Sequence, residues 1–518
     1  MVLLMAVLLA GACTKDFEEI NTNPNSQTEG SNEGLLLGAQ IGAAKVLLDN
    51  VTSYNHNLGK WVEYYTTSMG DNNFIPSNPG DDYDEFWIYQ GLVTSTIPLL
   101  NRVLSNTEKT PHPNYTATAL VMKAWIYFNM TNLWGPVPFT DADKGEVAET
   151  PEYNKPKFDS QETIYHGVLN LLKSADSLFD MSGAQEVSMA ANSDAFAKGN
   201  ILAWKKFGNS LRARILLDMS DADPAFAKAG LEEIFSDPAK YPVLESNEDN
   251  FGMHWETQPN QAYSDPFLQY GINNVNPPVA VSGIVNILGE RKDPRMKVYF
   301  DTAAAYKAAP TYIGAPPSFD PQNPSGFTRM GTDSVSHISR KFSELTLRPI
   351  MTYPELLFIK AEAALKNINV GMSASQAYEA AVKADMQRWG IDPASTAVAT
   401  YLNNPLVKYD PSKALVQIVT QRYISQFGQS TNTFSLIRRT GFPELDYFTI
   451  GINKQYAYPV RMRYPSAMQT LNNDNLQAAI SGVTIVNAVF GDKLWFAQHA
   501  PDVKMAPAIQ TGPVTFVY

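Results

Sequence analysis

The sequence has few of the residue patterns that common enzyme chemistry requires. Its 518 residues include one cysteine, Cys13, which excludes internal disulfides and any Cys-x-x-Cys metal or redox site. The six histidines stand apart, without a His-Glu-x-x-His motif or a pair at i, i+4, so no zinc site is indicated. The phosphate-binding pattern Gly-x-x-x-x-Gly-Lys-(Ser/Thr) and the nucleophile pattern Gly-x-Ser-x-Gly are also missing. We therefore expect no metal, no cofactor and no catalytic residue. The paired carboxylates of a glycoside hydrolase stay open, because their separation depends on the fold.

Positive charge is also scarce. Lys and Arg number 40 against 52 Asp and Glu, which gives a net charge of −12 at pH 7. Nucleic acids attract basic surfaces, so this balance argues against a nucleic-acid partner. What the chain does contain is 44% hydrophobic and 11% aromatic residues, enough for a large folded core. Its 34 prolines and 31 glycines predict long irregular loops beside that core.

The apolar run at residues 1–12 is too short to span a bilayer and is typical of a secretory signal peptide. No Lys or Arg precedes it, so we expect a partial or truncated signal. Gly11 and Ala12 stand directly before Cys13, which resembles the cleavage site of bacterial lipoproteins. Cys13 is therefore expected to become the acylated N-terminus, and a buried free cysteine is the alternative. Residues 13–34 are polar and acidic, which favours a tether between lipid and folded body.

Apolar residues recur at helical spacing through residues 35–235 and 350–430, which predicts a mostly α-helical scaffold. The helix that begins near Thr116 is apolar on nearly every side, so it is expected to lie buried between other helices. Gly135 and Pro136 are expected to end it, after which the chain runs extended.

The same spacing places further helices at residues 35–50, 61–68 and 86–104, the last of them bent by Pro98. In the amphipathic helix that contains Trp204, we expect Lys205, Lys206 and Arg212 on the solvent side. A later helix is expected to be capped by Ser412 and stopped by Gly428.

Helical spacing disappears between residues 241 and 341, where prolines and aromatic residues recur. A loop-rich stretch of this length is usually functional or disordered, and its aromatic content favours an ordered insertion with few short strands. After it, Ala377, Ala381 and Ala384 match the small-residue positions of a tetratricopeptide (TPR) second helix, without a full consensus. The C-terminal segment, residues 431–518, is expected to be irregular.

Six motifs follow one another along the chain. They are Leu133-Trp-Gly-Pro-Val-Pro-Phe139, Trp204-Lys-Lys-Phe-Gly-Asn-Ser-Leu211, Asp293-Pro-Arg295, Arg438-Arg-Thr-Gly-Phe-Pro443, Val460-Arg-Met-Arg-Tyr-Pro465 and Asn472-Asn-Asp-Asn475. In this order they resemble the signatures of the SusD/RagB family of nutrient-binding lipoproteins, in its Arg-Arg-Thr-Gly branch. The resemblance covers essentially the whole chain.

The resemblance implies a fold, a location and a role. It implies a single domain over residues 35–518, with degenerate TPR helix pairs as its scaffold, and a lipid anchor on the outer face of the outer membrane. The protein would be non-enzymatic. It would capture an oligosaccharide and deliver it to a TonB-dependent SusC-like barrel. The alternatives are capture of peptides by the same architecture, a TPR scaffold that binds only protein partners, and a surface glycoside hydrolase.

Two loops contain aromatic and amide side chains that suit a sugar, because rings stack on the apolar faces of sugars and amides bind their hydroxyl groups. The candidate ligand-binding residues are Asn72, Asn73, Phe74, Tyr83, Trp255 and Tyr263. For any one of these rings, packing in the core under the loops is the alternative. Asp81, Asp82 and Asp84 are interpreted as a solvated turn, since the later Glu of a calcium loop is missing.

The arginines of the later motifs also allow two interpretations. Guanidinium groups bind carboxylates in ligands, and they equally fasten loops through carboxylate and carbonyl contacts. For Arg438, Arg439, Arg461 and Arg463 we favour the second role, because turn residues such as Gly441 and Pro443 accompany them.

Overall fold

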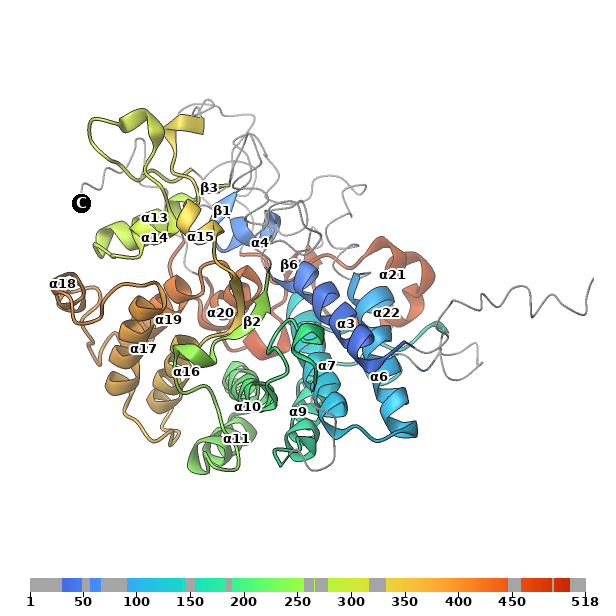
Figure 1. Ribbon diagram of the computed structural model, residues 1–518. Helices are drawn as coiled ribbons and strands as arrows, with labels where there is room; N and C mark the ends of the chain where they lie inside the picture. Colours follow the sequence, from blue (N-terminus) through green and yellow to red (C-terminus); the bar gives the residue numbers. More distant parts are fainter. Residues whose placement is uncertain are drawn as a thin grey trace, which may run out of the picture.

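The computed structural model describes residues 30–48, 56–66, 91–142, 144, 154–182, 189–255, 265, 278–315, 332–445, 458–486 and 489–503 (Figure 1). Helices dominate these ranges, which confirms the mostly α-helical prediction. The helices are α3 (Asn32–Leu47), α4 (His56–Trp61), α6 (Ile97–Lys109), α7 (Pro113–Trp134), α9 (Gln161–Leu178), α10 (Ile201–Asp218), α11 (Pro224–Ser236), α13 (Ser282–Glu290), α14 (Met296–Tyr299), α15 (Arg340–Ser343), α16 (Tyr353–Leu365), α17 (Ala374–Arg388), α18 (Thr396–Leu402), α19 (Ala414–Ser425), α20 (Ser430–Thr440), α21 (Ser466–Leu471) and α22 (Asn473–Ala479). The strands are β1 (Tyr65–Thr66), β2 (Phe251–His254), β3 (Val279–Ala280), β4 (Leu347–Met351), β5 (Ile485–Val486) and β6 (Phe490–Gly491).

Neighbouring helices along the chain pack on one another. In the first half, α3 contacts α6, α6 contacts α7, α7 contacts α9, α9 contacts α10 and α10 contacts α11. In the second half, α16 contacts both α17 and α19, and the two halves meet where α10 packs on α16 (Figure 1). Ala377 and Ala381, placed by the sequence at TPR small-residue positions, are fully buried where α17 meets α16. This succession of packed helices is the scaffold on which the rest of the chain lies.

One hydrophobic cluster extends through both halves and includes residues from Leu35 to Ala500. The insertion contributes Trp255 and Tyr299 to it, and the later part of the chain contributes Phe496. The strands are short and pair antiparallel, β1 with β3, β2 with β4 and β5 with β6. Among the described residues, therefore, the sheets connect segments at the edge of a helical core.

Helix α7 is the longest helix among the described residues and is buried on nearly every side. All of Ala117, Ala119, Val121, Met122 and Ala124 have no exposed surface, as the apolar composition predicted. The helix begins at Pro113, three residues before the predicted start, because proline is favoured in the first helical turn. It ends at Gly135, whose φ of 91° and ψ of −124° lie in a region open essentially to glycine alone.

The last carbonyl groups of α7 have no partner within the helix and are buried, so other segments must supply donors. Gly135 N–H donates to Thr131 O at 2.7 Å. Arg438 Nη1 donates to Asn132 O at 2.7 Å, and Met462 N–H donates to Leu133 O at 2.7 Å. Two motifs from the far end of the chain therefore complete this helix.

The extended arm after α7 is fastened by the same segment. Trp134 Nε1 donates to Arg463 O at 2.9 Å, and the Tyr464 hydroxyl donates to Pro136 O at 2.8 Å. Farther along the arm, the Asp159 carboxylate accepts hydrogen bonds from the backbone N–H groups of Phe139 and Thr140. The helix end and its arm thus form one junction, which we name the α7 terminus (residues 131–136 with Arg438 and residues 460–464).

Several sequence predictions about element boundaries are wrong. Among the described residues of the predicted helix at 61–68, none after Trp61 is helical, because α4 ends there, Glu63 turns the chain with φ of 56°, and β1 follows. Pro98 does not bend a helix but lies in the first turn of α6, directly after a π-helical turn at Gly91–Thr96. Helix α19 starts at Ala414 without a side-chain cap, and Ser412 donates to Asp410 instead.

Two further corrections concern burial and regularity. Arg212 is only 1% exposed, not on the solvent side, because Glu233 binds its Nη2 at 2.9 Å and the Tyr241 ring covers its guanidinium group. The segment after residue 430 is more regular than predicted, since α20, α21 and α22 all lie within it. The Arg-Arg-Thr-Gly motif is the last turn and the C-cap of α20, where Gly441 adopts the left-handed conformation.

We predict that Gly135→Ala lowers the free energy of unfolding by about 2–3 kcal/mol, because the backbone conformation disfavours any side chain. An added Cβ would also lie 2.8 Å from Leu494 Cδ2. The matched control is Gly371→Ala, which has φ of 74° but no atom within 4 Å of an added Cβ and should cost about 1 kcal/mol. Equal losses for the two variants in denaturant unfolding would contradict the tight α7 terminus.

Candidate functional site

The predicted ligand-binding residues divide into one that the structure describes and five that it does not. Asn72, Asn73, Phe74, Tyr83 and Tyr263 lie outside the described residues, as does Cys13. Trp255 is described and is 5% exposed, as part of the main hydrophobic cluster. Its backbone N–H donates to Thr346 O at 2.9 Å. The ring therefore packs in the core, the alternative that the sequence left open, and its contact with a ligand stays a prediction.

The structure brings the bases of the two predicted loops together. Strand β1 ends at Thr66, shortly before the first predicted loop in the sequence, and Pro278 and β3 come directly after residues 266–277 of the second. Strands β1 and β3 pair antiparallel, with Tyr65 opposite Ala280 and Thr66 opposite Val279. Paired strands lie about 4.8 Å apart, so segments more than 200 residues apart in sequence start from adjacent points. We name this pair of strands the loop base.

The β1 side of the loop base is fixed to the scaffold by buried tyrosines. The Tyr423 hydroxyl on α19 donates to Val62 O at 2.8 Å. The Tyr64 hydroxyl lies 2.9 Å from Thr433 Oγ1 on α20, and the rings of Tyr64 and Tyr423 are 4.8 Å apart between centroids. The side chains of Tyr64, Tyr423 and Thr433 are all buried. The turn before β1 therefore has its position set by α19 and α20.

The second loop is anchored where it leaves β2 and again at Asp265. Strand β2 pairs with β4, and His254 lies opposite Leu347 just before Trp255. Asp265, which is 1% exposed, forms an ion pair with Arg348 on β4. Arg348 Nη2 also donates to Phe342 O at 3.1 Å, so its guanidinium group joins Asp265 to α15. A buried ion pair thus fixes one point of the loop against the scaffold.

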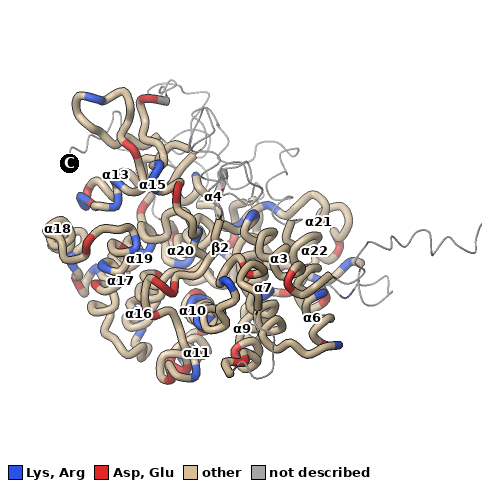
Figure 2. Tube along the Cα trace, viewed as in Figure 1, with Lys and Arg blue, Asp and Glu red and all other residues tan. Residues whose placement is uncertain are grey.

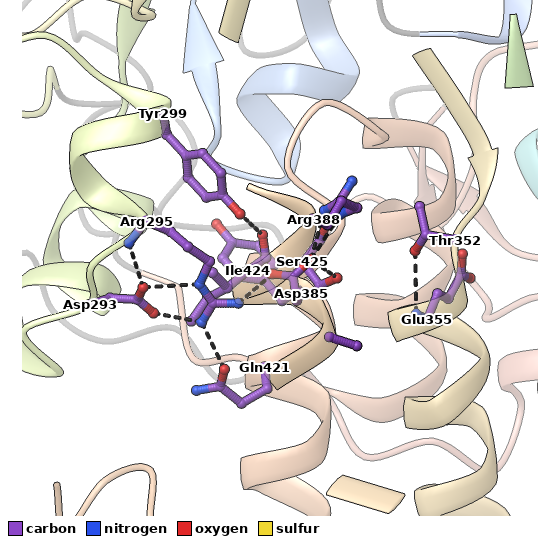
Figure 3. A network of polar contacts seen from close by, with 12 residues as sticks. Asp293, Arg295, Tyr299, Thr352, Glu355, Asp385, Arg388, Gln421, Ile424 and Ser425 are labelled. Atoms are coloured by element: carbon purple, nitrogen blue, oxygen red, sulfur yellow. Dashed lines mark hydrogen bonds and ion pairs between the residues drawn. The ribbon is translucent and has the colours of Figure 1, made fainter. Parts of the chain in front are cut away.

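The β3 side of the loop base belongs to a segment that Arg295 fastens to the helices (Figure 3). Arg295 has no exposed side-chain surface and binds both oxygens of Asp293, at 2.9 and 2.6 Å. It also donates to Asp385 Oδ2 on α17 at 2.6 Å, to Gln421 Oε1 on α19 at 2.8 Å and to the Tyr401 hydroxyl at 2.8 Å. The Asp-Pro-Arg motif is therefore the joint between the insertion and the second half of the scaffold.

In this joint, the carboxylate of Asp385 binds the guanidinium groups of two arginines. Arg388 Nη2 donates to Asp385 Oδ1 at 2.8 Å and to Ser425 O at 2.6 Å, beside the contact from Arg295 (Figure 3). Burial alone raises the pKa of Asp385, but the guanidinium groups of Arg388 and Arg295 bring it below its ordinary value. The carboxylate consequently stays ionised and holds both arginines.

Carboxylates on α16 are bound in the same manner. Glu355 accepts from Arg214 on α10 at 2.7 Å and from Arg422 on α19 at 3.0 Å. Glu362, two turns later, pairs with Arg439 on α20. Figure 2 marks the basic and acidic positions on these helices. Burial opposes ionisation of both glutamates, but the arginines lower the pKa of each below its ordinary value. These groups are structural ion pairs, since a general acid for glycoside hydrolysis needs a raised pKa.

Three of the four motif arginines make structural contacts of the kind that the sequence favoured. Arg438 donates to the carbonyl groups of Asn132 and Val460, and Arg439 pairs with Glu362. Arg461 Nη2 donates to Asp492 O at 3.3 Å. Sequence reasoning identified the role of these three residues but not their partners, which lie on other elements.

Two general observations complete the site. Within the part of the chain that the structure describes, no three His, Cys, Asp or Glu side chains are grouped so as to hold a metal ion. Along the same residues, no helix combines the length and the apolar composition that a membrane span requires.

Comparison with known proteins places the chain in a family. Residues 24–465 match the SusD-like family model described as "Starch-binding associating with outer membrane". The match covers most of the chain, and the chain therefore belongs to the SusD-like family. The comparison with curated proteins gave no match.

Solved structures share the fold. A chitin-binding SusD homologue from Flavobacterium johnsoniae is 20% identical, with a TM-score of 0.73 over 90% of this chain and 99% of that one. A SusD homologue from Bacteroides uniformis is 21% identical, with a TM-score of 0.74 over 89% and 99%. A SusD-like protein from Bacteroides thetaiotaomicron is 20% identical, with a TM-score of 0.71 over 90% and 99%. At these identities the similarity establishes the fold, which the sequence motifs had predicted.

We predict that Arg295→Met lowers the free energy of unfolding by about 3–5 kcal/mol, because it leaves the buried carboxylate of Asp293 without its cation. The matched control is Arg340→Met, in which an exposed i, i+4 pair with Glu344 is removed and no measurable change is expected. Denaturant unfolding followed by far-ultraviolet circular dichroism measures both. Equal stability of Arg295→Met and wild type would show that this joint does not hold the insertion.

Proposed function

We propose that this chain is a non-enzymatic, cell-surface nutrient-binding protein that captures an oligosaccharide. The observation that carries the proposal is the family match over residues 24–465, since that family is described as starch-binding and as associating with the outer membrane. Two structures with the same fold are named chitin-binding proteins, which supports a carbohydrate as the ligand class.

The capture site in this proposal consists of the two loops that border the strands of the loop base in the sequence. Their aromatic and amide residues, Asn72, Asn73, Phe74, Tyr83 and Tyr263, would contact the sugar. The sixth candidate, Trp255, is the buried ring that directly follows β2. The pairing of β1 with β3 supports this arrangement, because it brings the strand before the first loop beside the strand after the second. A scaffold that fixes the base while loops carry the contacts is the usual construction of a binding site.

The location follows from the expected lipid anchor. Acylated Cys13 and the tether of residues 13–34 would hold the protein at the outer face of the outer membrane. A tether of this kind raises the effective concentration of the protein near membrane neighbours, which favours docking. The partner in this proposal is a TonB-dependent SusC-like barrel, to which the captured ligand would be delivered.

We predict that a starch-derived or chitin-derived oligosaccharide binds with a Kd in the micromolar to millimolar range, about −8 to −4 kcal/mol, because an open loop site buries little area. Maltoheptaose, chitohexaose and a peptide pool would be titrated by calorimetry. Phe74→Ala and Tyr83→Ala should weaken sugar binding at least about tenfold, since ring stacking contributes a comparable free energy. The matched control is Phe226→Ala, which removes a ring that is 39% exposed on α11.

Each contrary result selects an alternative. Binding of peptides in preference to both sugars would favour peptide capture, and release of reducing ends would favour a hydrolase. Equal sugar affinity in the loop variants and in Phe226→Ala would remove the loops as the site. No binding of sugars or peptides would favour a TPR scaffold for protein partners.

A second prediction concerns anchor and partner together. Tagged protein purified from its native membrane in mild detergent should carry fatty acid and recover a large β-barrel transporter, because lid and barrel form a stable complex of roughly 2,000 Å². The control is Cys13→Ser, which should lose the fatty acid and leave the membrane fraction. Recovery of acylated protein without any barrel, under conditions that preserve other lipoprotein complexes, would contradict delivery to a transporter.

A further inference from the structure

A pocket of about 270 Å³ lies between the end of α20 and the C-terminal part of the described chain. It is lined by residues from three segments, which are Arg438, Tyr458, Val460, Gly491, Lys493, Leu494, Phe496, Ala497, Pro501, Asp502 and Val503. Its volume is just below the range of about 300–1,000 Å³ for small-molecule sites, so it suits a compact ligand. None of these residues belongs to the loop base.

The pocket contains a buried cation that lacks an anionic partner. Arg438 is 4% exposed, and its guanidinium group lies 3.7 Å from the centre of the Phe434 ring and 5.2 Å from that of Phe496. Its protein acceptors are carbonyl oxygens and, at 3.3 Å from Nη2, the Ser435 hydroxyl. Within the described residues, no carboxylate lies within ion-pair distance of Arg438.

Other buried arginines of this protein have the carboxylate partner that Arg438 lacks. Arg214, Arg295, Arg348 and Arg439 are each at most 4% exposed, and each is paired with at least one carboxylate. An unpaired buried charge is costly, and a carboxylate is the usual means of offsetting it. An anion bound beside Arg438 would therefore supply the negative charge that the protein itself does not place there.

A second arginine increases the positive potential near Arg438. Arg461 is 2% exposed, and its Nε and Nη1 atoms have no hydrogen-bond partner among the described residues. Burial, together with the charge of Arg461, lowers the pKa of Arg438 to about 9, so the group is still charged at neutral pH. Both effects would be relieved by an anion in the pocket.

The pocket also has a cation near the solvent. The Lys493 side chain is 32% exposed and forms an ion pair at 2.7 Å with Asp502, whose side chain is 91% exposed. The walls beside it are apolar, formed by Leu494, Phe496 and Val503. A ligand that fits has one negative group and an apolar body.

We propose that this pocket binds a small organic carboxylate with an apolar body. The carboxylate of the ligand lies against Arg438 and accepts a hydrogen bond from Nη2, whose only hydrogen bond among the described residues is the long one with Ser435. Lys493 attracts the ligand from the solvent side. The apolar body packs on Phe496 and Val503. None of the candidate residues for the oligosaccharide lines this pocket, so the pocket would bind a second ligand of a different chemical class.

The test compares an anion with its neutral isostere on the full chain. Phenylacetate and phenylacetamide have the same size, and we expect phenylacetate to bind at least tenfold more tightly in calorimetric titration. Val503→Trp should abolish this binding by filling the pocket from a partly exposed position. Lys493→Met should weaken it several-fold. The control is Lys366→Met, at a lysine whose exposure is comparable to that of Lys493 and which pairs with Asp221 on the surface, and it should leave the binding unchanged.

Arg438→Met is the direct variant, but it also removes a donor to the α7 terminus, so loss of folding would be uninformative and Val503→Trp decides. Equal affinities for phenylacetate and phenylacetamide would overturn the proposal. So would undiminished phenylacetate binding in Val503→Trp, or the absence of saturable phenylacetate binding to the wild type. Sugar binding is expected to be unchanged in Val503→Trp, so the two sites can fail independently.

Discussion

The fold depends on satisfying the backbone carbonyl groups at the buried end of α7. A helix that ends at the surface leaves its last carbonyls to water, but this one ends in the core. The chain resolves the problem with Arg438 and Met462, each more than 300 residues away in sequence. Because the same junction fixes the arm and the C-terminal segment, the geometry of α20 and of residues 458–464 follows from it.

Buried arginine–carboxylate pairs hold the remaining joints. Glu355 and Glu362 use one face of α16 to connect α10, α19 and α20, while Arg295 and Arg348 attach the insertion. Such pairs contribute little net stability compared with apolar packing, but they tolerate few alternative arrangements. They therefore fix where the loop base sits, and Arg438 departs from the pattern by lacking a carboxylate.

The sequence predicted the features that depend on a repeated apolar spacing or on local composition. Helix α7 was located to within three residues because it is apolar all round, and the glycine after it marked its end. The strands of the loop base escaped prediction, since two residues carry no alternation pattern. Arg212 was misplaced because Glu233 and Tyr241, which bury it, come later in the chain. Aromatic content alone could not separate Trp255 in the core from a ring that contacts ligand.

The α7 terminus also has a consequence for biogenesis. Its contacts join positions separated by as many as 329 residues, as between Arg463 and Trp134, so the core closes only when almost the whole chain is present. Non-local closure of this kind slows folding and leaves incomplete chains with polar groups that nothing covers. A chain that stops before residue 458 would retain most of its helices yet present unsatisfied carbonyls at their centre. The junction therefore distinguishes a finished molecule from a truncated one.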